Sequence, residues 1–65
     1  MTPDPTPRQE QILLLVGEGL SNKEIADRIG LGERTVKHHT DRLRAKLGVK
    51  KKRELIPIAR AWEVK

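Results

Sequence analysis

Helix-capping and helix-breaking residues divide this chain of 65 residues into short segments. Thr6 precedes Pro7 and stands three residues before Gln9, a pattern typical of a capped helix start with proline at the first position. Gly19 is placed to end that helix, because glycine readily adopts the left-handed conformation that closes many helices. We therefore expect a first helix from Pro7 to about Glu18.

The following segments show the same signals. Ser21 and Glu24 form a second capping box, which begins a short helix that ends at the glycine-rich turn 30–32. A longer helix is expected over residues 33–47, ending at Gly48. No segment alternates polar and apolar residues with the period of a strand. The prediction is an all-α fold, a four-helix bundle without strands, in which two helices joined by a short turn form a helix-turn-helix.

Pro57 constrains the last apolar segment. Proline has no N–H for the carbonyl oxygen of Arg53 and costs about 3 kcal/mol in a helix interior. The basic run from Lys50 to Arg53 also disfavours a helix start there, since a helix N-terminus is itself positive. We expect a fourth helix from Glu54 to Trp62 that begins late and is shortened or bent at its start.

The composition excludes several classes of protein and favours an acidic partner. Lys and Arg number 14 against 9 Asp and Glu, which gives a formal net charge of +5. The absence of cysteine excludes disulfides and thiolate metal sites and suits a cytoplasmic location. The longest apolar run, residues 12–16, is too short to span a membrane. Residues 1–5 carry no signal pattern and are expected to form a disordered lead-in to a domain over residues 6–65.

The chain shows no arrangement of residues typical of catalysis. It lacks a nucleophile–base pair, a glycine-rich phosphate loop and a paired-carboxylate site, so we expect neither an enzyme nor a cofactor. His38 and His39 are adjacent, and adjacent helical residues point about 100° apart. They cannot chelate one metal ion together, and we expect no metal site.

The helix expected over residues 33–47 separates its side chains onto two faces. A buried stripe at helical spacing comprises Val36, Thr40, Leu43 and Leu47. The opposite face comprises Arg34, Lys37, His38, Asp41 and Ala45, bordered by Thr35 and Arg42. A slim face with a basic, hydrogen-bonding front half fits the major groove of DNA, which admits one helix. A solvated helix face of mixed charge would show the same pattern, so periodicity alone leaves both interpretations open.

The same segments match a known family residue by residue. The matching stretches are residues 6–8, Leu13, 18–26, 31–39 and 46–49. Through them, the chain from Thr6 to Arg60 resembles the GerE-like DNA-binding domain of the LuxR and FixJ/NarL regulators. The resemblance implies sequence-specific binding to double-stranded DNA as the output domain of a bacterial transcription regulator, with RNA polymerase as a further partner.

The resemblance also implies roles for individual residues. The positions that read base edges in the family hold Lys37, His38 and Asp41, and Arg34 lies on the same face. The positions near phosphates hold Asn22, Lys23, Thr35 and Lys50, and Arg42 borders the same face. In the family the fourth helix packs beside its copy to form a homodimer on DNA, and here it would offer Leu55, Ile58 and Trp62.

Besides Pro57, which interrupts the fourth helix, three positions depart from the family's pattern. Gln9 stands where the family usually has Glu, which preserves the cap but loses any ion pair made by that Glu. Asp41 places a negative charge on a basic face, where it could accept from cytosine N4 or pair with Arg34 or Lys37. Leu14 is apolar where relatives are often polar, and is either a contact with another domain or an exposed leucine.

Two other functions remain open at this stage. A protein-interaction domain built on the helix-turn-helix is kept open by Asp41. An RNA-binding module is disfavoured because recognition of single-stranded RNA relies on aromatic stacking, and Trp62 is the only aromatic residue. A membrane-active peptide is also disfavoured, since helices broken by glycine suit a packed bundle.

Overall fold

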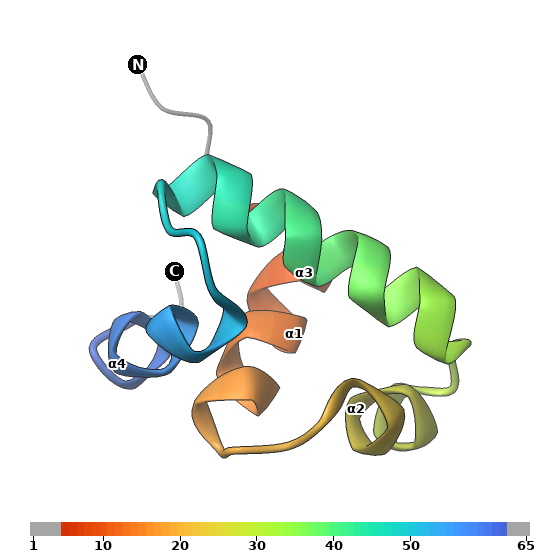
Figure 1. Ribbon diagram of the computed structural model, residues 1–65. Coiled ribbons are helices and arrows are strands. Elements are labelled where there is room, and N and C mark those ends of the chain that lie inside the picture. Colours follow the sequence, from red (N-terminus) through yellow and green to blue (C-terminus); the bar gives the residue numbers. More distant parts are fainter. Residues whose placement is uncertain (1–4, 63–65) are drawn as a thin grey trace.

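A computed structural model describes residues 5–62 of the chain, and within this range the secondary structure is entirely helical (Figure 1). The elements are α1 (Pro7–Gly17), α2 (Asn22–Ile29), α3 (Glu33–Leu47), a 3₁₀ turn η1 (Lys52–Glu54) and α4 (Leu55–Arg60). The prediction of an all-α fold with four helices is confirmed. The expected lead-in falls almost wholly on residues 1–4, which lie outside the described residues, as do residues 63–65 at the end of the expected domain.

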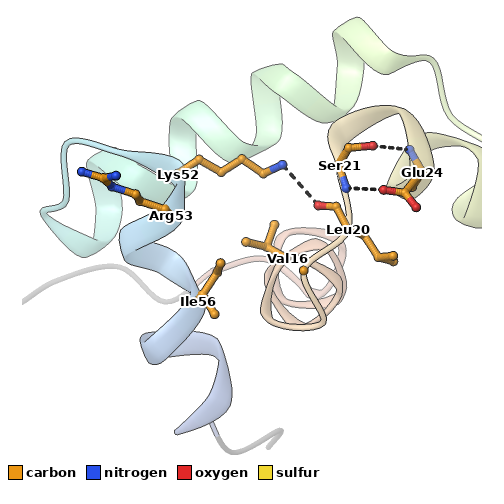
Figure 2. A pocket seen from close by; sticks show the side chains of 8 residues that line it. Val16, Leu20, Ser21, Glu24, Lys52, Arg53 and Ile56 are labelled. Atoms are coloured by element: carbon orange, nitrogen blue, oxygen red, sulfur yellow. Dashed lines mark hydrogen bonds between the residues drawn. The ribbon is translucent and has the colours of Figure 1, made fainter.

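Both capping boxes form as the sequence predicts. The Thr6 hydroxyl accepts from the Gln9 backbone N–H at 3.2 Å, and Gln9 Oε1 accepts from the Thr6 N–H at 3.1 Å. Ser21 and Glu24 make the equivalent pair at 3.1 and 2.9 Å (Figure 2). The Ser21 backbone N–H, with its hydroxyl, holds the pKa of Glu24 below its ordinary value. Each box satisfies backbone donors that a helix start would otherwise leave unpaired.

Glycines end α2 and α3 at the expected places. Gly30 and Gly48 have φ angles of +73° and +72°, a left-handed conformation that side chains with a Cβ rarely adopt. After Gly48, the Val49 N–H donates to the Arg44 carbonyl oxygen at 3.0 Å, which is the wider bond of a Schellman turn. The chain therefore turns sharply at both points, and the short link between α2 and α3 gives the helix-turn-helix its geometry.

The core forms where α3 lies across α1 and α4 packs along α1 (Figure 1). The buried apolar side chains come from every helix: Ile12, Leu13, Val16, Ile25, Ala26, Val36, Leu43, Leu55 and Ala59. Leu14, the apolar departure from the family pattern, is half-buried. The approach of α1 to α4 is so close that a Cβ atom at Gly17 would lie 2.7 Å from the Cβ of Ala59.

The last helix begins late, as expected from Pro57, but its bounds differ from the prediction. Residues Lys52–Glu54 form the 3₁₀ turn, α4 starts at Leu55, and it ends at Arg60 instead of continuing to Trp62. Pro57 is the third residue of α4, within the first turn, where its missing N–H costs no intrahelical bond. The 3₁₀ turn therefore leads the chain into α4 without placing proline in a helix interior.

Side-chain bonds hold the C-terminal segment against the rest of the domain. Lys52 reaches from η1 across a hollow of about 270 Å³ and donates to the Leu20 carbonyl oxygen at 3.3 Å (Figure 2). Trp62 Nε1 donates to Glu10 Oε2 at 2.7 Å, which joins the end of α4 to α1. No helix among residues 5–62 is long and apolar enough to cross a membrane.

The orientation of α4 corrects one expected pairing residue. Leu55 is fully buried in the core, so its side chain cannot contact a second copy of the domain. Ile58 is half-buried, and Trp62 is half-buried with its indole nitrogen already bonded to Glu10. Leu55 is therefore not part of the pairing surface, because the close contact between α1 and α4 turns that side of α4 toward the core.

Candidate nucleic-acid interface

The buried stripe of α3 fixes which of its side chains face outward. Val36, Thr40 and Leu43 are buried, and the Thr40 hydroxyl donates to the Lys37 carbonyl oxygen at 2.8 Å. Leu47, the fourth predicted member of the stripe, is half-buried and packs against the core. The Thr40 bond satisfies a polar group that would otherwise be costly to bury. The stripe confirms the predicted orientation of α3 and leaves its opposite face to solvent.

Arg34 and Lys37 stand on that outward face in the first half of α3. Both side chains are exposed, and neither side chain forms a hydrogen bond or ion pair with any of residues 5–62. Together with Asn22 and Glu33 they line a hollow of about 380 Å³ between the start of α2 and the start of α3. The two cations are therefore placed next to each other and next to a helix N-terminus, which is itself positive.

The start of α2 carries the next two predicted residues. Lys23 is exposed, whereas Asn22 is half-buried and its Oδ1 atom is buried without a partner in the described part of the chain. An amide oxygen cannot donate to a phosphate, so any phosphate contact of Asn22 must use its Nδ2 donor. The structure places Asn22 beside Arg34 and Lys37, in the lining of the same hollow.

His38 and Arg42 form a pair on the exposed face of α3. Arg42 Nε donates to His38 Nε2 at 3.0 Å, one helical turn apart. A nitrogen that accepts this bond carries no hydrogen, so the neutral ring has its hydrogen on Nδ1. His38 is thereby a donor toward a ligand, and the Arg42 guanidinium is oriented along the helix surface.

His39 turns toward the core. It is half-buried, and its Nδ1 atom is buried without a partner among residues 5–62. Burial, with smaller electrostatic contributions from His38, Arg8 and Arg42, holds the pKa of His39 below its ordinary value. Because desolvation disfavours the charged ring, His39 is neutral at physiological pH and serves as a packing residue.

Asp41 has a different partner from the two that the sequence offered. Its carboxylate forms an ion pair with Arg44, one turn later in α3, and not with Arg34 or Lys37. The hydrogen bond from Arg44 is the main reason that the pKa of Asp41 lies below its ordinary value. Arg44 was absent from the predicted site, although its spacing of three residues from Asp41 could have suggested the pair.

The remaining predicted residues lie at the borders of this face. Thr35 and Lys50 are exposed, the first in the opening turn of α3 and the second in the loop that follows it. Behind them, Lys46 donates to Gln9 Oε1 at 2.8 Å and joins α3 to α1. Gln9 thus serves as a neutral hydrogen-bond acceptor for the Lys46 cation, in addition to its part in the Thr6 cap.

Comparison with known proteins identifies the family to which this chain belongs. The model of the family described as bacterial regulatory proteins, luxR family, matches residues 6–59. The chain belongs to the luxR family. It is a DNA-binding regulatory domain of that family, which confirms the resemblance carried by its sequence motifs.

Two relatives illustrate the similarity. The chain is 49% identical over 47 residues to the DNA-binding transcriptional activator DevR/DosR of Mycobacterium tuberculosis, a match that covers 72% of this chain and 22% of the relative. It is 40% identical over 52 residues to the oxygen regulatory protein NreC of Staphylococcus aureus, covering 80% of this chain and 24% of the relative. The chain therefore spans less than a quarter of the length of either relative.

Proposed function

We propose that this luxR-family domain recognises specific double-stranded DNA sequences by placing the first half of α3 in the major groove. The observation that carries the proposal is the pair Arg34 and Lys37, whose side chains are exposed and form no hydrogen bond or ion pair with any of residues 5–62. The major groove admits one helix, and the N-terminal residues of a recognition helix contact base edges. Unpartnered donors at that position support base contact.

The side chains of α3 have distinct chemistry for base edges. Arg34 and Lys37 can donate to guanine O6 and N7, and His38 can donate through Nδ1 because Arg42 occupies its Nε2. We do not assign a base to Asp41, because its carboxylate is engaged by Arg44. The proposed base-reading residues are therefore Arg34, Lys37 and His38.

The proposed phosphate contacts surround this set. They are the Asn22 amide nitrogen and Lys23 at the start of α2, the Thr35 hydroxyl, Arg42, and Lys50 after α3. A helix N-terminus attracts phosphate through its free N–H groups and its dipole, which supports the assignment at α2. These contacts position the domain on DNA and contribute affinity without sequence preference.

A domain of this kind would act as the output module of a cytoplasmic transcription regulator. DevR/DosR is named as a DNA-binding transcriptional activator, which supports a role in regulation and makes RNA polymerase a further proposed partner. Pairing on DNA would use Ile58 and the exposed part of Trp62. We expect this small surface to leave the free domain monomeric at micromolar concentration and to pair two copies on a two-site duplex.

Sedimentation velocity tests the pairing. The free domain should sediment as a monomer, and a two-site duplex should carry two copies, whereas an otherwise identical one-site duplex carries one. A tight dimer without DNA would contradict the small pairing surface.

Salt titration tests duplex binding itself. If each copy of a dimer neutralises about three to five phosphates, the slope of log K against log salt should lie between about −5 and −9. The control is a single-stranded RNA of the same length. A flat salt response on duplex DNA, or equal affinity for the RNA, would overturn the proposal.

The ion pair of Asp41 weakens the argument for a protein partner. Asp41 had kept that alternative open as a negative charge on a basic face, but its charge is compensated by Arg44. Among residues 5–62, the cations that remain unpaired on the exposed face of α3 are Arg34 and Lys37, which supports an acidic partner.

A further inference from the structure

The loop after α3 is held by charged side chains on both sides of Lys50. Arg44 Nη1 donates to the Lys50 carbonyl oxygen, while its Nη2 donates to the Asp41 carboxylate. From the other side, Glu54 Oε2 accepts from the Lys50 N–H at 2.8 Å and from the Lys51 N–H at 3.0 Å. The exposed Lys50 main chain thus has both polar groups satisfied by ionised side chains of the domain.

The guanidinium of Arg44 is suited to this bridge by its shape. Its N–H groups form a rigid planar fork, so fixing one of them on Asp41 also orients the others. Hydrogen bonds to ionised groups are roughly twice as strong as those between neutral groups. Asp41 is therefore linked, through Arg44, to the backbone of the loop.

The Lys50 side chain is not used by these bonds. It is exposed and forms no hydrogen bond or ion pair with any of residues 5–62, although its main chain is held by Arg44 and Glu54. A cation on a fixed backbone loses less conformational freedom when it meets a phosphate than one on a mobile loop.

We propose that Asp41 and Arg44 form a positioning pair that fixes the Lys50 main chain and so presents the Lys50 side chain to a DNA phosphate. This inference rests on the proposed duplex binding for its effect on affinity. A carboxylate on a basic face would ordinarily weaken DNA binding, because phosphates repel it. Here the Asp41 carboxylate strengthens DNA binding, because it helps to order the Lys50 cation.

The decisive variant is Asp41→Asn, because charge and positioning change affinity in opposite directions. Removal of a negative charge alone should leave duplex affinity unchanged or raise it. Loss of the positioning pair should lower affinity about two- to five-fold, the range expected for an exposed ion pair. Asp27→Asn, an exposed carboxylate on α2, is the matched charge control and should not weaken binding.

A second background separates positioning of Lys50 from other effects of Asp41. The Lys50→Ala variant keeps the carbonyl oxygen of residue 50 that Arg44 contacts but lacks the ammonium group. In this variant, adding Asp41→Asn should not weaken DNA binding further. Arg44→Lys keeps the positive charge but lacks the planar guanidinium that bonds both Asp41 and the Lys50 carbonyl oxygen. This single variant should therefore bind duplex DNA more weakly. Urea unfolding of each variant confirms that the compared proteins are folded.

The free domain supplies a readout that does not depend on DNA. Backbone ¹⁵N order parameters at Lys50 and Lys51 should fall in Asp41→Asn and Arg44→Lys and stay unchanged in Asp27→Asn. Unchanged order at Lys50, or weakening of DNA binding by Asp41→Asn that persists in Lys50→Ala, would overturn the inference. A fall in order in a domain that does not bind duplex DNA would support the positioning pair and contradict the proposed function instead.

Discussion

Two regions of the domain differ in how closely their side chains are packed: the contact between α1 and α4, and the first half of α3. At the first, Gly17 faces Ala59 so closely that no methyl group fits without displacement. At the second, Arg34 and Lys37 line a hollow, and their side chains form no hydrogen bond or ion pair with any of residues 5–62. Burial and close packing stabilise a fold, whereas unpartnered donors are available to a ligand. Substitutions in the two regions should therefore separate stability from recognition.

The largest expected loss of stability is at Gly17→Ala. Overpacking against Ala59 costs about 1–3 kcal/mol, offset by up to about 1 kcal/mol of helix propensity. We expect the urea midpoint to fall while the folded variant keeps its DNA affinity. In the double variant Gly17→Ala with Ala59→Gly, the clash is relieved, so the two changes should cost less than the sum of their separate costs. Strict additivity would contradict the close approach.

Lys37→Ala should give the complementary result. Loss of a base contact costs about 1–3 kcal/mol of binding free energy and relaxes preference at one base pair, with unfolding unchanged. Lys23→Ala is the control, since loss of a phosphate contact should weaken all duplexes by one common factor. The measurement is affinity on a panel of single-base operator variants, selected first from random duplexes. If Lys37→Ala lowers the affinity for every operator variant by the same factor, Lys37 contacts a phosphate and not a base.

Gln9 belongs to neither region, since it caps the start of α1 and bonds to Lys46 near the end of α3, and it should affect stability but not base preference. Gln9→Ala removes the reciprocal cap with Thr6 and the acceptor of Lys46, and we expect a loss of about 1–2 kcal/mol of stability. Gln9→Glu keeps both roles and should be at least as stable as the natural domain. Gln11→Ala, exposed on the same helix, is the control and should change little. A change in base preference at Gln9→Ala would show that the regions are coupled.

The smallest expected effect is a dependence of stability on pH through His39. Its pKa in the folded domain lies below the ordinary value of 6.5, so the unfolded chain binds more protons as the pH falls through that value. The free energy of unfolding should therefore decrease between pH 7 and pH 5. His39→Gln should remove most of this decrease, and His38→Gln should retain it. An equal pH profile in both variants would contradict the buried environment of His39.

Local chemistry in the sequence was sufficient to predict the helices. The Thr6 and Ser21 caps, the glycines at the ends of α2 and α3, and Pro57 act within a few residues, and each formed where its pattern placed it. The spacing of Val36, Thr40 and Leu43 likewise determined which face of α3 is buried. Family motifs extended these local signals to DNA binding, which the luxR-family match bears out.

Only the tertiary structure decided choices that local spacing leaves equal. Asp41 has a cation one turn before it in Lys37 and one turn after it in Arg44, and the Arg44 fork that also reaches the Lys50 carbonyl oxygen decides between them. The sequence shows Leu55 only as an apolar residue on a short helix. Its burial follows from the close approach of Gly17 to Ala59, which turns that side of α4 toward the core. The sequence by itself determined the bounds of α2 and α3 and the start of α1, because capping and turn preferences are local. Partners and burial required the packed fold, because they depend on which surfaces meet.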